Sequence, residues 1–377
     1  FELGSITGIK FEDKDGDGVF DLGETPLKGW KIYIDENNNG RWDYGEKYEV
    51  TNSLGRYSFT GLKAGTYIVR EVNQSGWTQT TADPESITIK SGTHKLFVNF
   101  GNFKDATIKV FKNVVDINSR EVKDSHEFTV SLNDENFRTI SEKISVMYKV
   151  SGPGPFTITE IEDGDYESLG CYLPYGVLAT DIKVKSGQTY KVTCTNKQKP
   201  ASITIIKDVR KKGHGGEPVF SDDLFDIQLK WRKTVIATKS ISDSELNPQT
   251  AVFDSLNPGH YSFTELYKDG YIFKGCEPFN EVISRGVQHA NYYGHKDYQN
   301  LSLASNEHVT FICYNEVIKP VLKITKSNDS LVSGMYPGEI VTYTLTITAP
   351  NDGKKGKYLI KDVTVTDIAP AGFEYIP

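Results

Sequence analysis

The stretch ITIIK at residues 203–207 decides the fold, because IKVFK at 108–112 and ITGIK at 6–10 repeat it. In each copy every second residue is apolar or glycine until the last, which is Lys. Successive side chains of a β-strand point to opposite faces of the sheet, so each Lys lies on the face that its apolar partners bury. The pattern predicts three repeated modules that each open with a half-buried strand, and LKITK at 322–326 predicts the start of a fourth.

Two later strands complete each copy of the repeat. One ends in a Glu and the closing strand ends in an Asn, both on the apolar parity of their strand. The same order of strands, with the same residue type ending each one, recurs in all three copies while the intervening sequence differs, which indicates a true repeat. The three sets are Lys10, Glu71 and Asn102; Lys112, Glu160 and Asn196; and Lys207, Glu265 and Asn315.

The chain has 377 residues, more than one hydrophobic core usually holds. Its 21 Tyr, 19 Phe and 33 Gly, against 2 Met, favour strands and turns. We therefore expect an all-β fold of tandem β-sandwich modules, joined by linkers short enough to make a semi-rigid rod. The expected modules are residues 1–103, 104–199, 200–319 and a partial one at 320–377.

The 4 Cys residues follow the repeat. In the second and third copies, one Cys lies eleven residues after the Glu and another lies two residues before the Asn. This agreement predicts the disulfides Cys171–Cys194 and Cys276–Cys313, and hence an oxidising compartment. No Cys-x-x-Cys pair is present, so a zinc site is not expected.

Charge and hydropathy argue against two classes of protein. A net charge of −7 is unfavourable for nucleic-acid binding, which needs Lys and Arg against the phosphates. No apolar run approaches the roughly 18 residues of a membrane-spanning helix. The chain opens beside a strand and ends within a module, so we expect a fragment of a longer protein whose targeting and anchoring parts lie outside it.

Two stretches of the first module have the acidic spacing of an EF-hand loop, which gathers oxygen ligands around a Ca²⁺ ion. The first loop carries more carboxylates than the second, so we expect it to bind calcium more tightly. Strands flank both loops, which favours a structural ion over a helix-opening sensor; solvated acidic turns without metal are the alternative. The ligand positions are Asp13, Asp15, Asp17, the Val19 carbonyl, Asp21 and Glu24 in the first loop, and Asp35, Asn37, Asn39, the Arg41 carbonyl, Asp43 and Glu46 in the second.

The Lys–Glu–Asn sets need an explanation, because burying such groups without partners is costly. One explanation is an internal ion pair, or a Lys that snorkels to solvent at the strand end. The other is a covalent crosslink. A desolvated, neutral Lys attacks the Asn carboxamide while the Glu moves protons, so that ammonia leaves and an isopeptide bond joins the first and last strands. The first set is the weaker candidate, because calcium can stiffen that module.

Several motifs resemble known families. GIKFEDKDGDG at 8–18, GRYSF at 55–59 and GTYIVRE at 65–71 are similar to the calcium-binding B repeats of serine-aspartate-repeat adhesins, which are prealbumin-like sandwiches of bacterial surface proteins. The resemblance implies two calcium sites and a stalk role. The second and third modules resemble, more loosely, the CnaB or SpaA pilin type of this Ig-like fold, from which their Cys pairs depart. PGEIVTY at 337–343 and VTVTD at 363–367 resemble a surface repeat of the DUF11 kind.

These inferences favour a structural stalk or fibre-forming segment of a secreted cell-surface or cell-wall-associated protein. Its partners would be neighbouring modules of the same chain and, in a fibre, identical subunits. The alternative is an adhesin module that itself binds an extracellular protein or glycan, and a carbohydrate-binding accessory module would need a row of exposed aromatic side chains. An enzyme is not expected, because the 7 His residues are scattered and none belongs to a catalytic motif.

Overall fold

The computed structural model shows a chain made almost entirely of β-strands. It divides into two compact units, Phe1–Lys199 and Pro200–Pro377. In the part of the chain that the structure describes, the one helical element is the 3₁₀ turn Pro174–Gly176, so the all-β prediction is confirmed. The described residues are 2–211, 217–244, 247–248, 250–279, 297–317, 323–328 and 343–348.

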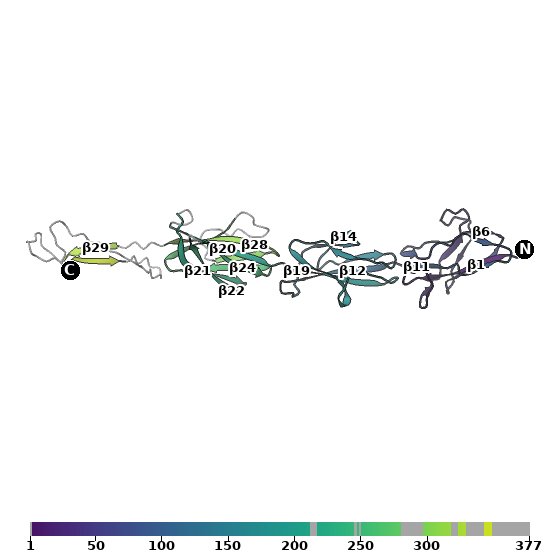
Figure 1. The fold of residues 1–377 in the computed structure, drawn as a ribbon, viewed down its shortest axis with the longest axis horizontal. Coiled ribbons are helices and arrows are strands. Elements are labelled where there is room, and N and C mark those ends of the chain that lie inside the picture. The colour runs from purple at the N-terminus through teal and green to yellow at the C-terminus, as the bar shows by residue number, and fades with distance from the viewer. Residues whose placement is uncertain are drawn as a thin grey trace, which may run out of the picture. The chain divides into compact units, whose positions relative to one another are not determined.

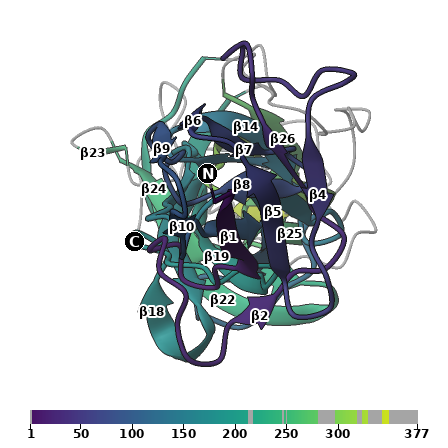
Figure 2. The same cartoon turned by 90° about the vertical axis from the view of Figure 1, so that its right-hand side faces the viewer.

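The first sandwich is built around β1 (Gly4–Glu12), whose alternate residues are buried as its sequence predicts. This strand runs parallel to β10 (His94–Lys95) and β11 (Phe100–Lys104) and antiparallel to β5 (Arg56–Leu62). Figure 2 shows β1 beside β5, seen from the N-terminal end. The remaining strands are β4 (Tyr48–Val50), β3 (Lys31–Ile34) and β7 (Val69–Glu71) in the facing sheet, and the short β2 (Thr25–Pro26), β6 (Gly65–Tyr67), β8 (Trp77–Gln79) and β9 (Ile87–Ile89).

The second sandwich follows in the same unit, and only Asp105 separates β11 from its first strand. That strand, β12 (Ala106–Val115), runs parallel to the last strand, β19 (Thr189–Gln198), and the two lie side by side in Figure 1. The same sheet contains β15 (Val146–Val150), β17 (Tyr166–Leu173) and β18 (Val177–Leu178), and the facing sheet contains β14 (Glu135–Ile140), β13 (Phe128–Leu132) and β16 (Ile158–Glu160).

The second unit repeats this arrangement. Its first strand, β20 (Ala201–Arg210), runs parallel to β28 (His308–Val317) and antiparallel to β24 (Thr250–Leu256), and β26 (Tyr271–Pro278) pairs with the other edge of β28. The facing sheet contains β23 (Asn247–Pro248), β22 (Thr234–Ser244), β21 (Ser221–Trp231), β25 (Gly259–Glu265) and β27 (Asp297–Leu303).

Each sandwich has a hydrophobic core of its own between its two sheets. Beyond the third sandwich, β29 (Lys323–Asn328) pairs antiparallel with β30 (Tyr343–Thr348). The motif at 363–367, and most of the one at 337–343, lie outside the described residues, so the division into four modules stays a prediction. Core side chains include Phe59 and Phe100 in the first sandwich, Val110 and Val192 in the second, and Ile205 and Phe311 in the third.

Candidate functional site

The Lys and the Asn of each set lie on neighbouring parallel strands of one sheet. In all three sandwiches the Asn lies two residues beyond the residue that pairs with the Lys. The Glu comes from the facing sheet, at the end of β7, β16 or β25. The repeat in the sequence therefore has a structural cause, because one conserved offset between strands brings three polar side chains together inside each core.

The first set forms a closed triangle of polar contacts. Lys10 Nζ donates to Asn102 Oδ1 and lies 3.0 Å from Glu71 Oε2. Asn102 Nδ2 donates to Glu71 Oε1 at 2.6 Å. The carboxylate thus bridges the amine and the carboxamide nitrogen, which are the two groups between which a proton must move if the Lys displaces ammonia.

The third set has the same geometry. Lys207 Nζ donates to Asn315 Oδ1 at 2.7 Å and to Glu265 Oε2 at 2.6 Å. Asn315 Nδ2 donates to Glu265 Oε1 at 2.7 Å. The first set therefore matches the third, although the sequence made it the weaker candidate.

The second set is open on one side. Lys112 Nζ donates to Asn196 Oδ1 at 2.7 Å and also contacts Glu160 Oε2. Among the described residues, however, Asn196 Nδ2 and Glu160 Oε1 are both buried without a hydrogen-bond partner. The proton route from Glu160 to the leaving nitrogen is thus not formed in this arrangement.

The Lys side chains are enclosed rather than snorkelling, since all three have an exposed fraction of 0%. An aromatic ring covers the Nζ atom of each Lys. The ring belongs to a strand of the facing sheet or, for Trp30, to the residue just before β3 of that sheet. The distances from Nζ to the ring centroid are 4.4 Å for Lys10 over Trp30, 3.7 Å for Lys112 over Phe128 and 4.3 Å for Lys207 over Phe225.

Burial changes the protonation of these groups. It lowers the pKa of Lys10 to about 8, although the Glu71 carboxylate raises it in part. Burial likewise lowers the pKa of Lys112 and Lys207. It raises the pKa of Glu71 and Glu265, partly offset by the neighbouring Lys. A neutral amine beside a carboxyl that can carry a proton is the pair that nucleophilic attack on a carboxamide requires.

The first acidic loop begins directly after β1. Asp13 is fully buried, and its carboxylate accepts the Gly16 and Gly18 N–H groups, both at 2.7 Å. At the other end of the loop, Glu24 accepts the Lys14 N–H at 2.7 Å and the Asp21 N–H at 3.1 Å. The first and last ligand positions thus close the loop into a ring of hydrogen bonds.

The charges inside this ring fit a divalent cation. Oxygens of Asp13, Asp15 and Asp17 lie within 4.8 Å of one another. Burial raises the pKa of Glu24, and repulsion from Asp13 and Asp15 adds to the rise. Hard carboxylate oxygens at this spacing are the ligand set that Ca²⁺ prefers, and a cation would relieve their repulsion. Asp13, Asp15, Asp17, the Val19 carbonyl, Asp21 and Glu24 are the residues that would hold it.

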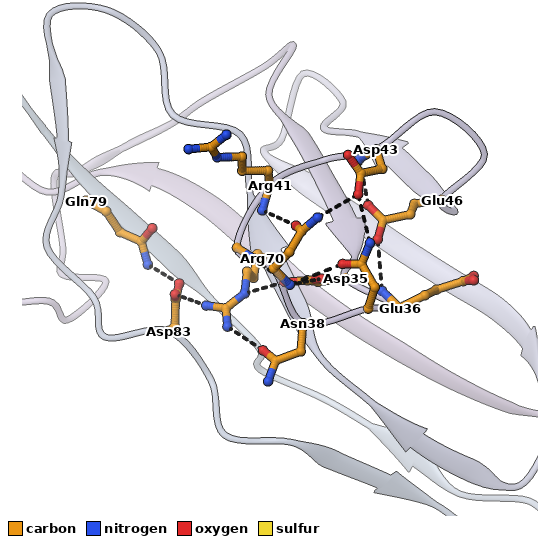
Figure 3. Close-up of polar contacts among 12 residues, drawn as sticks. Asp35, Glu36, Asn38, Arg41, Asp43, Glu46, Arg70, Gln79 and Asp83 are labelled. Atoms are coloured by element: carbon orange, nitrogen blue, oxygen red, sulfur yellow. Dashed lines mark hydrogen bonds and ion pairs between the residues drawn. The ribbon is translucent and has the colours of Figure 1, made fainter.

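The second loop has the same ring of hydrogen bonds. Asp35 accepts the Asn39 N–H at 3.1 Å and the Gly40 N–H at 2.9 Å. Glu46 accepts the Glu36 N–H at 3.0 Å and the Asp43 N–H at 2.8 Å. Figure 3 shows Asp35, Asp43 and Glu46 gathered in this loop.

The second loop differs from the first because it has a cation of its own. Arg70, from β7, donates through Nε to Asp35 Oδ2 at 2.8 Å and through Nη2 to Asn38 Oδ1 at 3.1 Å. It also contacts Asp83 (Figure 3). Burial alone would raise the pKa of Asp35, but the hydrogen bonds that it accepts from Gly40, Arg70 and Asn39 lower this pKa below its usual value. Arg70 thus neutralises part of the charge that calcium would otherwise balance.

Disulfides join the last strand of the second and third sandwiches to its antiparallel neighbour. The pairs are Cys171–Cys194 and Cys276–Cys313, as the repeat predicts, and each is a directly opposed pair in the strand register. Each disulfide lies on the same strand as the Asn of its set, two residues before it. Two different links therefore converge on the closing strand.

Sequence reasoning missed several residues around these sites. Trp30, Phe128 and Phe225 cover the Lys groups, and their position in strands or turns of the facing sheet gave no separate signal. Arg70 was seen only as part of a strand motif. Trp77, on β8, packs edge-on against Trp30 at 5.6 Å between ring centroids.

No helix among the described residues is long and apolar enough to cross a membrane.

The fold and these sites define a modular β-sandwich protein, and comparison with known proteins is consistent with this. Residues 4–96 match the family described as SdrD B-like domain, which confirms the resemblance of the first module. The chain is 27% identical over 230 residues to serine-aspartate repeat-containing protein D of Staphylococcus aureus strain Newman, covering 54% of this chain and 14% of that protein. It is 26% identical over 210 residues to serine-aspartate repeat-containing protein F of Staphylococcus epidermidis strain ATCC 12228, covering 49% of this chain and 12% of that protein.

The chain thus spans about one seventh of the length of the first of these relatives. Among solved structures it is similar to the Bacillus anthracis TIE protein, with a TM-score of 0.37, 15% identity, and coverage of 84% of this chain and 51% of that one. It is also similar to BcpA, the major pilin subunit of Bacillus cereus, with a TM-score of 0.31, 10% identity, and coverage of 84% and 100%. The chain is an extracellular or cell-wall-associated protein.

Proposed function

We propose that this chain is a load-bearing stalk or fibre segment in which each sandwich is locked by a bond between its first and last strands. The observation that carries the proposal is the contact between a buried Lys and a buried Asn on these two strands, repeated three times with a Glu beside it. Three occurrences of one costly arrangement are hard to account for by packing alone.

The proposed reaction is an autocatalytic isopeptide bond. The neutral Lys Nζ attacks the Asn Cγ, so a new N–C bond forms and the Cγ–Nδ2 bond breaks. One amine proton passes through the Glu to Nδ2, which leaves as ammonia, and the Glu ends in the state in which it began. The reaction happens once per site, so the chain does not act as an enzyme with turnover.

Such a bond suits a stalk because of where force would enter. The first and last strands of each sandwich are parallel neighbours. Tension along the chain therefore pulls them past each other and loads the hydrogen bonds between them. A covalent link at Lys and Asn would carry this load directly and leave the rest of the sandwich unstressed.

Calcium is proposed to stiffen the first module further. In both acidic loops backbone N–H groups donate hydrogen bonds to the carboxylates at the first and last ligand positions. Among the described residues, no basic side chain bonds to the first ligand of the first loop as Arg70 does in the second. A bound ion would supply positive charge at the centre of the loop. Loops of this kind in extracellular modules bind at about 10⁻⁴–10⁻³ M, within reach of external calcium.

The test is the intact mass of the denatured, metal-free protein, measured before and after reduction. Each crosslink removes one ammonia, and reduction does not restore it, whereas each disulfide gains two hydrogens. We expect the reduced chain to lack up to three ammonias. The variant Lys207→Met should regain one of them, because it removes the nucleophile while keeping an apolar side chain of similar length. A reduced mass equal to that of the sequence would overturn the crosslinks and leave calcium and disulfides as the sources of stiffness.

A further inference from the structure

We propose that the first calcium loop is completed by the second module, with Ser186 as its positioning residue. This inference rests on the proposed calcium binding and adds to it a residue 174 positions away in the sequence. Ser186 lies in a tight turn before β19 and is 6% exposed. Its N–H donates to the Lys14 carbonyl at 3.0 Å, and its Oγ donates to Glu12 Oε1 at 2.7 Å.

These contacts fall on the start of the calcium loop. Lys14 occupies the second position of the loop, and Glu12 immediately precedes Asp13, the first ligand. A third contact reaches the fourth position, where Gly16 lies against Pro153 of the second module: a Cβ on Gly16 would come within 2.7 Å of the Pro153 ring. Three points along the loop entrance, at Glu12, Lys14 and Gly16, are thus in contact with the second module.

The second loop gives a contrast within the same module. There Arg70 holds the first and fourth positions through Asp35 and Asn38, so the restraint comes from a neighbouring strand of the same sandwich. The first loop has its restraint at the same end, but the Ser186 turn and Pro153 supply it. The two loops therefore depend on different parts of the chain for their order.

The physical consequence is linkage. Calcium binding has to offset the free-energy cost of ordering the loop and bringing its carboxylates together. A loop that is already held in place has less of this cost and binds calcium more tightly. By thermodynamic reciprocity, calcium in the loop must then favour the contact between the two modules by the same factor. Calcium would accordingly fix the junction around Asp105 as well as the first sandwich.

The chain offers a matched control for this role. Ser91 lies in the equivalent turn of the first module, in KSGT at 90–93 against KSGQ at 185–188. Ser91 Oγ accepts the Glu2 N–H at 3.0 Å, just as Ser186 Oγ accepts the Lys104 N–H at 2.8 Å. Only the Ser186 turn touches an acidic loop, so Ser91→Ala removes the same local contact without affecting calcium.

The experiment is calorimetric titration of the full chain with CaCl₂, in a Glu46→Gln background that weakens the second loop. We expect Ser186→Ala to weaken the remaining site about three- to tenfold, the effect of losing one or two hydrogen bonds. Ser91→Ala should leave the affinity unchanged. Hydrogen exchange of the unmutated chain gives a readout that needs no variant to fold, and calcium should slow exchange in residues 183–190 of the second module.

The outcomes separate the two proposals. Equal calcium affinity in Ser186→Ala and its parent, or calcium binding without slower exchange at 183–190, would overturn the role of the second module while leaving the calcium site intact. If the Glu46→Gln chain binds no calcium, or if Asp17→Asn does not abolish the binding, then the proposed calcium site itself is wrong and this inference falls with it.

Discussion

Asn102 links the buried Lys10 to Asp13, the first residue of the first acidic loop. Its side-chain oxygen accepts a hydrogen bond from Lys10, and its backbone carbonyl accepts the Asp13 N–H at 2.9 Å. The sequence interpretation treated calcium as a substitute for the crosslink in this module. The geometry instead brings the Lys–Glu–Asn set and the acidic loop to the same residue of β11, and the side chain of Lys10 is as fully buried as those of Lys112 and Lys207. We therefore treat the first set as a candidate equal to the third.

Replacing the Glu of a set by Gln should stop its crosslink. Glu71→Gln or Glu265→Gln removes the group that carries the proton from the amine to the leaving nitrogen, while keeping the size of the side chain. We expect the reduced intact mass of each variant to regain one ammonia, after allowance for the substitution itself. Glu167→Gln changes an exposed carboxylate on β17 and should regain none. Loss of ammonia that continues undiminished in Glu71→Gln would exclude Glu71 as the proton carrier.

Stability at alkaline pH should report the buried Lys10 when it is not crosslinked. Asn102→Ala blocks the bond and leaves the amine, whose pKa burial lowers from 10.5 to about 8. Below pH 8 the folded state bears the cost of a buried ammonium, and above pH 10.5 neither state carries the charge. Between these values the unfolded chain binds more protons, so the free energy of unfolding should rise with pH, by at most about 3 kcal/mol.

Denaturant unfolding at pH 7.5, 8.5 and 9.5 measures this dependence. The double variant Lys10→Met, Asn102→Ala lacks the titrating group and serves as the control, so its stability should stay flat over the same range. An equal slope in both variants would assign the pH dependence to other groups. A fall in stability of Asn102→Ala across this range would mean that burial does not lower the Lys10 pKa.

The parts of these sites that the sequence predicted are those with short or periodic spacing. Candidate loop ligands such as Asp13 and Glu24 lie close together in the sequence. Strand parity alone places Lys10 and Asn102 on a buried face. The missing parts are contacts between distant segments. Arg70 reaches Asp35 across 35 residues, and Ser186 reaches Glu12 across 174. Neither contact has a periodic signal, because each depends on which loops meet once the sheets have formed.

Arg70 should set how strongly the second loop depends on calcium. Arg70→Gln removes the cation that bonds to the buried Asp35 carboxylate, so the calcium-free module should lose about 2 kcal/mol of stability. Calcium can replace this charge, and its stabilising effect should therefore be larger in the variant than in the parent chain. Thermal unfolding of the first module with calcium and with a chelator measures the difference.

Arg41→Gln is the matched control for this prediction. It removes one positive charge from the loop itself, but the Arg41 side chain is exposed and points away from Asp35 (Figure 3). We expect its response to calcium to equal that of the parent chain. If Arg41→Gln and Arg70→Gln respond alike, general loop charge rather than the Arg70–Asp35 bond controls calcium dependence.

The disulfide of the second module should be mechanically silent while its crosslink is intact. A bond between Lys112 and Asn196 carries tension from β12 directly to β19 and shields every residue between them, including Cys171 and Cys194. Pulling a single chain should then give the same extension with or without a reducing agent. In Lys112→Met the tension passes through the sandwich, and the disulfide becomes the remaining barrier to full extension.

Force spectroscopy distinguishes these states by length. The loop closed by Cys171–Cys194 has a sequence separation of 23, so reduction should lengthen unfolded Lys112→Met by about 80 Å. The third module, with its own Lys207–Asn315 set, provides an internal reference in the same molecule. If reduction lengthens the second module in the unmutated chain too, the Lys112–Asn196 bond is absent there.

The second module is also the one in which the crosslink should form most slowly, because Asn196 Nδ2 makes no hydrogen bond to Glu160 among the described residues. Freshly folded protein should therefore respond to reduction at first and lose that response as the bond forms.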